Sequence, residues 1–216
     1  MGPADTGLDN GRLIDAYDVV VRLNFTSSSD IEGYEKSHGT KTHVSYFNNP
    51  VFKKLGSSQL LATLMSESIF PVLRGEGSLL KTDINNNHEL NEIRTMHVTP
   101  ITFSSRYSYH GIQRVALDLL SFEPAELALF NMDFFTGVAG GESNRIKSYR
   151  TAGSDLGYTH DPLQGLRLIR YLHKCGLVVI DEVIEQVLQW SDEQYIHHIE
   201  NLEKNNPSFL KIINKV

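Results

Sequence analysis

The sequence predicts an α/β protein built on a mostly parallel β-sheet flanked by helices. Short apolar or β-branched runs alternate along the chain with segments whose apolar residues recur every three or four positions. This alternation is typical of successive strand–helix units, which pair their strands in parallel. The length of 216 residues allows one such domain with a full core and is too short for two ordinary ones. We therefore expect a single domain over residues 1–216.

The predicted strands are short runs bounded by turn-forming residues, as buried strands of a parallel sheet should be. The first of them, residues 18–23, is rich in valine. The strands are expected over residues 18–23, 43–47, 68–73, 94–98, 127–130 and 177–180.

The predicted helices carry an apolar stripe along one face. The clearest covers residues 111–122, where Ile112, Val115, Ala116 and Leu119 recur at the spacing of one helical face. Further helices are expected over residues 59–66 and 162–174. Two more close the chain, the last over residues 192–204 after a Ser191 cap with Gln194 three residues on.

The composition is that of an ordinary globular protein, with 40% hydrophobic and 21% charged residues. A net charge of −6 and a pI near 5.8 argue against nucleic acid as a partner. No apolar run approaches the length of a membrane-spanning helix. Cys175 is the single cysteine, which excludes an internal disulfide and fits a reducing compartment. Its place between a predicted helix and strand favours a small buried hydrophobic residue over a catalytic thiol.

The start of the chain departs from the usual plan of such a sheet. An apolar strand normally comes directly before the first glycine turn, yet Gly2, Pro3 and Ala4 follow only Met1. We therefore expect the first, central strand to be missing from residues 1–216.

The first fifty residues carry the most specific pattern. Residues 11–24 read Gly-x-x-Ile-Asp-x-x-Asp-x-Val-x-Arg-x-Asn, and residues 33–42 read Gly-Tyr-Glu-Lys-x-x-Gly-Thr-Lys-Thr. This run resembles the large sialylmotif of sialyltransferases, in which G-x-x-I-D-x-x-D-x-V-x-R-x-N leads into G-[FY]-E-x-x-x-G-x-[KR]-T. The resemblance implies a Rossmann-like domain, a variant of the GT-A fold, that binds a cytidine nucleotide sugar.

Asn24 follows the first predicted strand, at the edge where open α/β sheets bind ligands. Its amide offers both donors and an acceptor, and the resemblance implies that it contacts the donor nucleotide. The turn at Gly2 and Pro3 resembles the G-N-G-P-S turn of bacterial lipooligosaccharide sialyltransferases, which implies close approach of the nucleotide there. Asn49 resembles the asparagine of their F-Y-N-P sequence, with Asn48 one residue away. Ordinary turns are the alternative interpretation of all these positions.

A second match lies before the clearest helix. Residues 109–111 and the sequence Asn-Met-Asp-Phe that follows the next strand resemble the small sialylmotif, which runs [ST]-[ST]-G, a helix, a strand and G-x-D-F. The resemblance implies that His110, Gly111 and Asp133 contact the donor nucleotide, with backbone amides at the helix start facing its phosphate. Here His110 stands in place of a hydroxyl residue, and Asn131 in place of the glycine.

His160 lies between a glycine-containing polar stretch and the helix predicted over residues 162–174. In the resembling family a histidine between the lid loop and the last sheet-flanking helix is the general base, and imidazole is matched to that task at neutral pH. The animal-type pattern is H-x-x-x-x-E, and Gly165 stands where that acid belongs. A helix-capping or core histidine is the alternative.

The resemblance implies an inverting displacement in which His160 takes a proton from an acceptor hydroxyl as this hydroxyl attacks the anomeric carbon of the sialyl donor, and CMP leaves. Tyr149, Tyr158 and His110 are the candidate donors to the phosphate. We expect neither metal nor other cofactor, because CMP carries one phosphate and the chain has no Asp-x-Asp. The expected partners are therefore a CMP-sugar donor and an acceptor glycan.

Two alternatives stay open: a transferase of another CMP-sugar such as CMP-Kdo, and a degenerate, non-catalytic nucleotide-binding remnant. The single cysteine cannot form the disulfide that joins the two motifs in Golgi enzymes of the family. A cytoplasmic location is therefore expected, compatible with peripheral association at the inner membrane surface, and a Golgi lumenal one is disfavoured.

Overall fold

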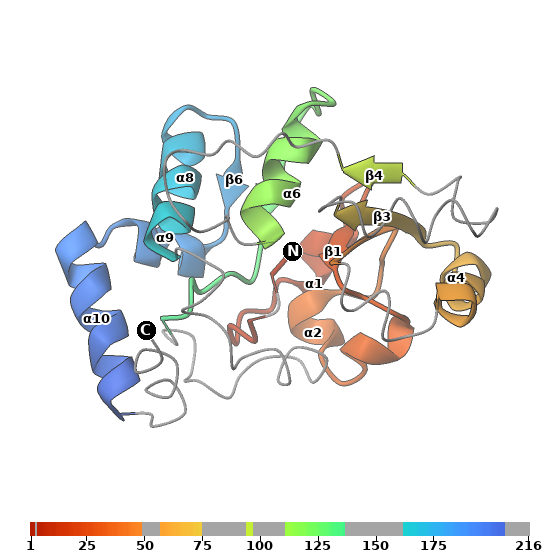
Figure 1. Cartoon of the computed structure of the whole chain (residues 1–216), viewed down its shortest axis with the longest axis horizontal. Helices are drawn as coiled ribbons and strands as arrows, with labels where there is room; N and C mark the ends of the chain where they lie inside the picture. The colour runs from red at the N-terminus through yellow and green to blue at the C-terminus, as the bar shows by residue number, and fades with distance from the viewer. Residues whose placement is uncertain (3, 49–56, 75–93, 97–110, 137–161, 206–216) are drawn as a thin grey trace.

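The protein has an α/β fold in which each pairing between described strands is parallel (Figure 1). This confirms the expected α/β class and the parallel pairing. The strands form a four-stranded sheet in the order β1-β2-β3-β4 and a two-stranded sheet of β5 and β6. The computed structural model describes residues 1–2, 4–48, 57–74, 94–96, 111–136 and 162–205. The strands are β1 (Val21–Leu23), β2 (Val44–Phe47), β3 (Phe70–Arg74), β4 (Arg94–Met96), β5 (Ala128–Leu129) and β6 (Val179–Ile180).

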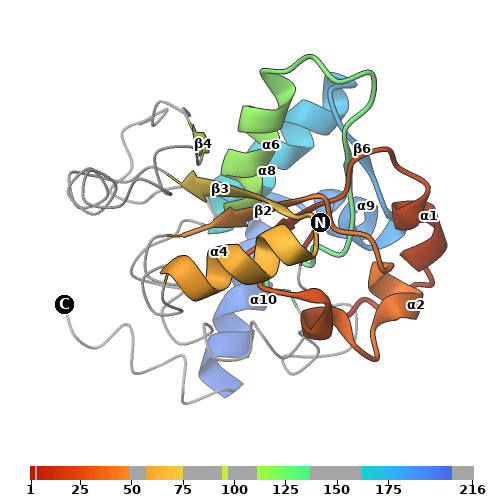
Figure 2. The same ribbon diagram turned by 90° about the vertical axis from the view of Figure 1, so that its right-hand side faces the viewer.

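Helices cover both faces of the four-stranded sheet, with α4 (Ser57–Ser66) on one side and α6 (Gly111–Leu120) on the other (Figure 2). Neighbouring residues of a strand point to opposite faces. Phe47 and Leu73 accordingly enter the core beneath α4, while Tyr46 and Val72 enter the core beneath α6. Burial on both faces explains why apolar residues follow one another directly at Tyr46–Phe47 and at Val72–Leu73 instead of alternating with polar ones.

The two-stranded sheet packs with the C-terminal helices α8 (Pro162–Lys174), α9 (Glu182–Leu188) and α10 (Asp192–Asn205). The apolar stripe of α8 is buried in this core, as the spacing predicts, through Leu166, Ile169 and Leu172. Ala116 of α6 belongs to the same core, while Val115 belongs to the core of the four-stranded sheet. One helix therefore joins the two halves, and the expectation of a single domain stays a prediction.

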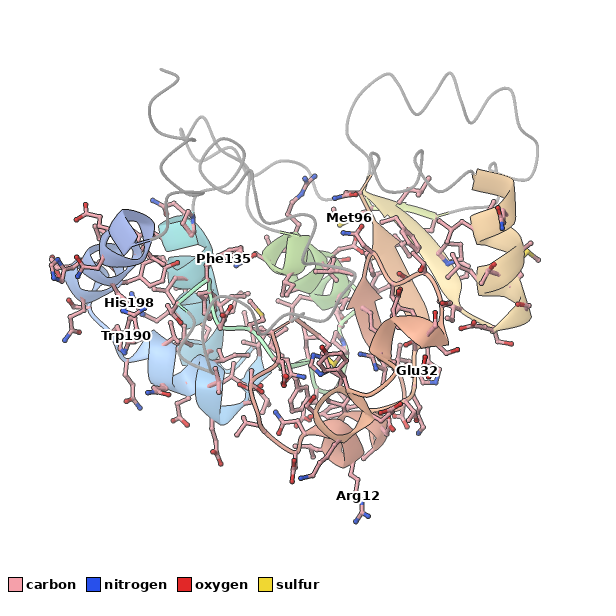
Figure 3. The ribbon with its side chains drawn as sticks, turned by 90° about the horizontal axis from the view of Figure 1, so that it is seen from below. Arg12, Glu32, Met96, Phe135, Trp190 and His198 are labelled. Atoms are coloured by element: carbon pink, nitrogen blue, oxygen red, sulfur yellow. The ribbon has the colours of Figure 1, made fainter. Side chains whose placement is uncertain are left out.

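The last helix begins with the expected capping box. Gln194 N donates to Ser191 Oγ at 3.1 Å, and Ser191 N donates to Gln194 Oε1 at 2.7 Å. Two of the unpaired amides at the start of α10 are thereby satisfied. Trp190 and His198 lie against each other beside this helix, with ring centroids 4.9 Å apart (Figure 3).

Three short helical segments were not expected: α1 (Gly11–Asp15), the 3-10 helix η1 (Ser28–Ile31) and α2 (Glu35–His38). Each is about one turn long, too short for a hydrophobic period to show in the sequence. The first predicted strand is also shorter than expected, because β1 begins only at Val21.

Cys175 is exposed, so the expectation of a buried thiol is wrong. Cys175 follows Leu172 at the spacing that would continue the apolar stripe of α8. The helix ends at Lys174, however, and the chain turns at Gly176, where φ is +71°. Val178 enters the core instead.

The N-terminal residues connect the two sheets. Met1 donates from its amino group to Val21 O in β1 at 3.0 Å, and Gly2 N donates to Phe130 O directly after β5 at 2.7 Å. Ala4 N then donates to the carbonyl of Asn131 at 3.1 Å. Residues from the first turn of the chain therefore lie between β1 and the end of β5. None of the helices in the described parts of the chain is long and apolar enough to cross a bilayer.

Candidate functional site

The two halves of the N-terminal pattern fold against each other around Asp15, the last residue of α1. The Asp15 carboxylate accepts from the backbone N–H groups of Thr40 and Lys41 at 2.9–3.0 Å and from the Thr40 hydroxyl at 2.9 Å. Burial alone would raise the pKa of Asp15, but the hydrogen bonds from Lys41 and Thr40 outweigh it and lower that pKa. The aspartate of the pattern thus closes a loop of the protein itself.

The glycines of the pattern lie where the backbone segments approach most closely. A Cβ at Gly11 would stand 2.1 Å from Glu35 O, and a Cβ at Gly39 would stand 2.5 Å from Asp15 Oδ1. Gly39 also has φ of +69°, a conformation that other residues adopt at a cost. Gly11 is therefore required by packing of α1 against α2, and Gly39 by packing of the residue after α2 against Asp15.

Arg22, in the middle of β1, is buried and serves the same unit. Its guanidinium donates to His38 O at 2.8 Å, to Lys41 O at 2.9 Å and to Thr42 Oγ1 at 2.6 Å, and it lies over the ring of Phe25. Backbone carbonyls after α2 thus receive charge-assisted hydrogen bonds. The arginine of the pattern holds the loop rather than facing a ligand.

Asn24 stands at the carboxyl end of β1 and joins it to β2. Its backbone N–H donates to Tyr46 O at 2.7 Å, and its Oδ1 accepts from Asn48 N at 3.0 Å. The backbone is left-handed here, with φ of +49°, which asparagine tolerates better than most residues. Because Oδ1 is engaged, the Nδ2 group is what Asn24 can offer to a ligand at this edge.

Gly2 approaches the end of β5 so closely that a Cβ would lie 2.1 Å from Asn131 O. Asn131 is fully buried, and its side chain accepts from Thr6 Oγ1 and donates to Ser37 O, both at 2.9 Å. Asp181, the cap of α9, accepts from the Asn131 backbone N–H at 2.7 Å. Gly2 is therefore needed for a close backbone approach, and the group that it approaches is the backbone carbonyl of Asn131.

His38 is buried beside this turn, and sequence reasoning missed it because it occupies a variable position of the pattern. Its Nδ1 lies 2.7 Å from Ser37 Oγ. Burial and the nearby Arg22 lower the pKa of His38 to about 4, although Asp5 and the Ala4 backbone raise it in part. The imidazole is therefore neutral at pH 7. In the sequence Asn131 stands only in the place of a glycine of the small motif pattern, and no periodicity marks Asn131 or His38.

Asp133 lies in a turn beyond the end of β5, and Gly111 stands at the start of α6. The Asp133 carboxylate accepts from Phe135 N at 3.0 Å and shapes a turn in which Phe134 and Phe135 both have positive φ. Gly111 is the first residue of α6. The structure thus places Gly2, Asn24 and Asp133 just beyond or beside strand ends and Gly111 at a helix start. The nucleotide contacts expected of these residues stay predictions.

A separate polar cluster fastens α6 to the four-stranded sheet. Tyr46 donates from its hydroxyl to Asp118 Oδ2 at 2.6 Å, and Arg94 pairs with the same carboxylate through two contacts of 2.7 Å. Burial and the hydrogen bond to Asp118 raise the pKa of Tyr46. These three side chains satisfy one another within the interface, so they are a structural cluster apart from the strand ends.

A cavity of about 80 Å³ lies elsewhere, between β1, β5 and α6. It is lined by residues 19–23 and 126–130, by Met1 and by the inner face of α6, and Gly2, Asn24, Gly111 and Asp133 are not among its lining residues. Within the described ranges, no group of three or more histidine, cysteine or acidic side chains is placed to hold a metal ion. The remaining candidates, Pro3, Asn49, His110, Tyr149, Tyr158 and His160, lie outside the described residues.

The chain matches no protein-family model, and no curated protein matches its sequence significantly.

Proposed function

We propose that this chain is an inverting glycosyltransferase that moves sialic acid from CMP-sialic acid to a hydroxyl of an acceptor glycan, on a Rossmann-like domain of GT-A-variant type. One observation carries the proposal. Residues 11–24 and 33–42, which match the large sialylmotif pattern, fold as one unit that ends in Asn24 at the carboxyl edge of a parallel sheet. Ligands of open α/β sheets bind at this edge.

The roles within the unit support that proposal. Asp15, Arg22 and Gly39 hold its backbone together, which leaves Asn24 at the strand tip with its Nδ2 group for a ligand. An N–H donor suits the carbonyl oxygen and ring nitrogen of cytosine or a ribose hydroxyl. The turn at Gly2 lies beside the end of β5, where Gly2 N donates to Phe130 O. This position favours the same edge for the proposed nucleotide site.

In the proposed reaction His160 accepts the proton of the acceptor hydroxyl while its oxygen attacks the anomeric carbon of the donor. The bond from that carbon to the CMP oxygen breaks, and CMP leaves with the bonding electron pair. Donors from His110, Tyr149 or Tyr158 neutralise its phosphate, so the step uses no metal. A general base of this kind contributes about 10²–10⁴-fold in rate.

Turnover tests the proposal. CMP release from CMP-sialic acid is measured with a galactose-terminated acceptor, and His160→Ala is expected to lower the rate at least about 100-fold. His197→Ala is the matched control, because His197 is exposed on α10 and contacts Asn201. Equal rates in the two variants would remove His160 from the mechanism, and CMP release from CMP-Kdo alone would change the donor sugar.

A second candidate, a nucleotide-binding protein without transferase activity, is favoured by the cavity between β1 and β5, which leaves the centre of the fold incompletely filled. Calorimetric binding of CMP by a chain that releases no CMP from any CMP-sugar would support this candidate over the transferase.

A further inference from the structure

The turn that follows β5, residues 131–136, holds three residues in the left-handed region of backbone conformation. Asn131, Phe134 and Phe135 have φ of +57°, +49° and +66°. Asparagine tolerates this conformation, whereas a bulky aromatic residue adopts it rarely and at a cost. Two consecutive phenylalanines persist in it only if the surrounding structure holds them there. The strained pair lies beyond the carboxyl end of β5, at the kind of edge where open α/β sheets bind ligands.

Hydrogen bonds within this turn tie the place of Asp133 to that of the residues after it. Phe135 N donates to Asp133 Oδ1 at 3.0 Å. Thr136 donates to Asp133 O twice, from its amide at 2.9 Å and from its hydroxyl at 2.6 Å. Each of these bonds ends on Asp133, so the position of this residue depends on where Phe135 and Thr136 are held.

Helix α10 grips the turn at two carbonyl groups. The Tyr195 hydroxyl donates to Phe134 O at 2.7 Å, and His198 Nε2 lies 2.7 Å from Thr136 O. A carbonyl oxygen only accepts, so Nε2 carries the proton and donates. Tyr195 and His198 are three positions apart and therefore lie on one face of α10. These two residues, which we call the α10 clamp, hold the carbonyls on either side of Phe135.

The clamp is itself fixed to helix α8. Asp192, the first residue of α10, pairs with Arg167 at 2.6 Å and with Arg170 at 2.9 Å. Arg170 also donates to Trp190 O at 2.8 Å. The Trp190 ring packs against His198 with ring centroids 4.9 Å apart and an interplanar angle of 64° (Figure 3). Both the start of α10 and the ring of its histidine are thus held in place from the side of α8.

We propose that His198 and Tyr195 are positioning residues of the donor-nucleotide site, which hold the strained turn after β5 in the conformation that binds CMP. This inference rests on the proposed function, in which Asp133 contacts the donor nucleotide. The clamp acts through the carbonyls of Phe134 and Thr136, 61 and 62 positions away in the sequence, and needs no contact with the nucleotide.

The strain explains why a clamp at this point affects affinity. Without its two hydrogen bonds the phenylalanines can leave the left-handed region, and Asp133 moves with them. The turn then occupies the binding conformation for only part of the time. The apparent affinity falls in proportion to that fraction. Loss of one clamp bond therefore weakens CMP binding, and a replacement donor restores it.

The test compares CMP binding by calorimetry in variants of the whole chain. His198→Ala removes the donor to Thr136 O and is expected to weaken CMP binding about fivefold or more, the factor that one net hydrogen bond supplies. His198→Gln keeps an N–H donor on the side chain and is expected to recover most of the affinity. Urea unfolding establishes that each variant is folded at the temperature of the titration, so a change in stability alone leaves the affinity unaltered.

Tyr195→Phe is the second variant. It keeps the buried ring in the core and removes the hydroxyl that donates to Phe134 O, so CMP binding should again weaken about fivefold. His197→Ala is the matched control. His197 precedes His198 directly on α10, is exposed and contacts Asn201, so its loss should leave CMP affinity as it is.

The outcomes separate this inference from the proposed function. If the unaltered protein, His198→Ala and Tyr195→Phe bind CMP equally well, the clamp has no positioning role and the proposed function stands. Equal weakening by His198→Gln and His198→Ala, or by His197→Ala as well, would also overturn the positioning role. Failure of the unaltered protein to bind CMP would contradict the proposed function, and the positioning role with it.

Discussion

Asp15 and Thr40 lie 25 positions apart in the chain and share three hydrogen bonds of 2.9–3.0 Å. Together with the bond from Lys41 N, they close the segment that contains β1 and α2 into one unit. The residues that resemble the large sialylmotif therefore have a structural reason for their identities. In this protein the pattern reports on the fold around a strand tip.

Gly39→Ala is expected to destabilise the protein more than Gly33→Ala. Both glycines have positive φ, +69° and +84°, so an alanine is strained at either position, and more so at Gly39, whose ψ of −180° completes a conformation that essentially only glycine adopts. At Gly39 the added Cβ also meets Asp15 Oδ1 at 2.5 Å, whereas nothing lies within 4 Å at Gly33. We expect a total loss of about 3 kcal/mol or more for Gly39→Ala, measured by urea unfolding. Equal losses in the two variants would show that this contact adapts without cost.

Tyr46→Phe is expected to lower the free energy of unfolding by about 1–2 kcal/mol, because it removes a buried hydrogen bond to the Asp118 carboxylate. Tyr17→Phe is the matched control. Tyr17 donates to Glu126 at 2.7 Å in an exposed pair, whose loss should cost less than about 0.5 kcal/mol. A cost for Tyr17→Phe as large as that for Tyr46→Phe would contradict the assignment of the anchoring role to Tyr46.

Asn24→Asp should weaken CMP binding at least about tenfold with little change in stability. A carboxylate still accepts from Asn48 N and tolerates the left-handed backbone, but it removes the Nδ2 donor and adds a negative charge beside the proposed site of an anionic nucleotide. Calorimetry with CMP and thermal melting separate the two effects. Asn201→Asp on α10 is the charge-matched control, and an affinity that falls equally in both variants would argue against a nucleotide site at the strand tip.

The stability of the protein should fall as the pH is lowered from about 7 to about 4.5. The pKa of His38 is lowered from 6.5 to about 4 in the folded chain, so the unfolded chain binds more protons between these values. The free energy of unfolding therefore rises with pH through this window and reaches its full value above pH 6.5. The contribution is on the order of 3 kcal/mol.

His38→Gln should flatten this dependence, measured as urea midpoints between pH 4.5 and pH 7.5. The pKa of the Met1 amino group is lowered from 8.0 to about 5, so this group also makes the free energy of unfolding rise with pH, up to about pH 8. This effect is the same in the wild type and in His38→Gln. His173→Gln, which changes an exposed histidine of α8, is the matched control for the substitution itself. A profile unchanged by His38→Gln would show that the buried imidazole is not the titrating group.

Long elements with a clear period could be predicted from the sequence, and short ones could not. The stripe of Leu166, Ile169 and Leu172 and the capping box at Ser191 predicted α8 and the start of α10. The turn-length helices α1 and α2 are held by contacts such as those of Asp15 and Arg22, which join distant residues. Tertiary contacts of that kind leave no periodic signal.

The candidate site shows the same division. The position of Asn24 at a strand tip follows from the apolar run before it, and the structure places it there. The roles of His38 and Asn131 depend on the way that the N-terminal turn, α2 and the end of β5 meet, which sequence spacing does not express. The prediction that Cys175 is buried is wrong for a related reason. The position at which α8 ends decides which side chain enters the core, and sequence spacing does not fix that position to within one or two residues.

The exposed position of Cys175 has a practical consequence for handling the protein. It is the chain's single sulfhydryl and it stands at the surface beyond α8. Air oxidation can therefore join two molecules through this atom alone, giving a covalent pair that a sizing column would record as a dimer. Sizing with and without dithiothreitol distinguishes such a pair from genuine self-association.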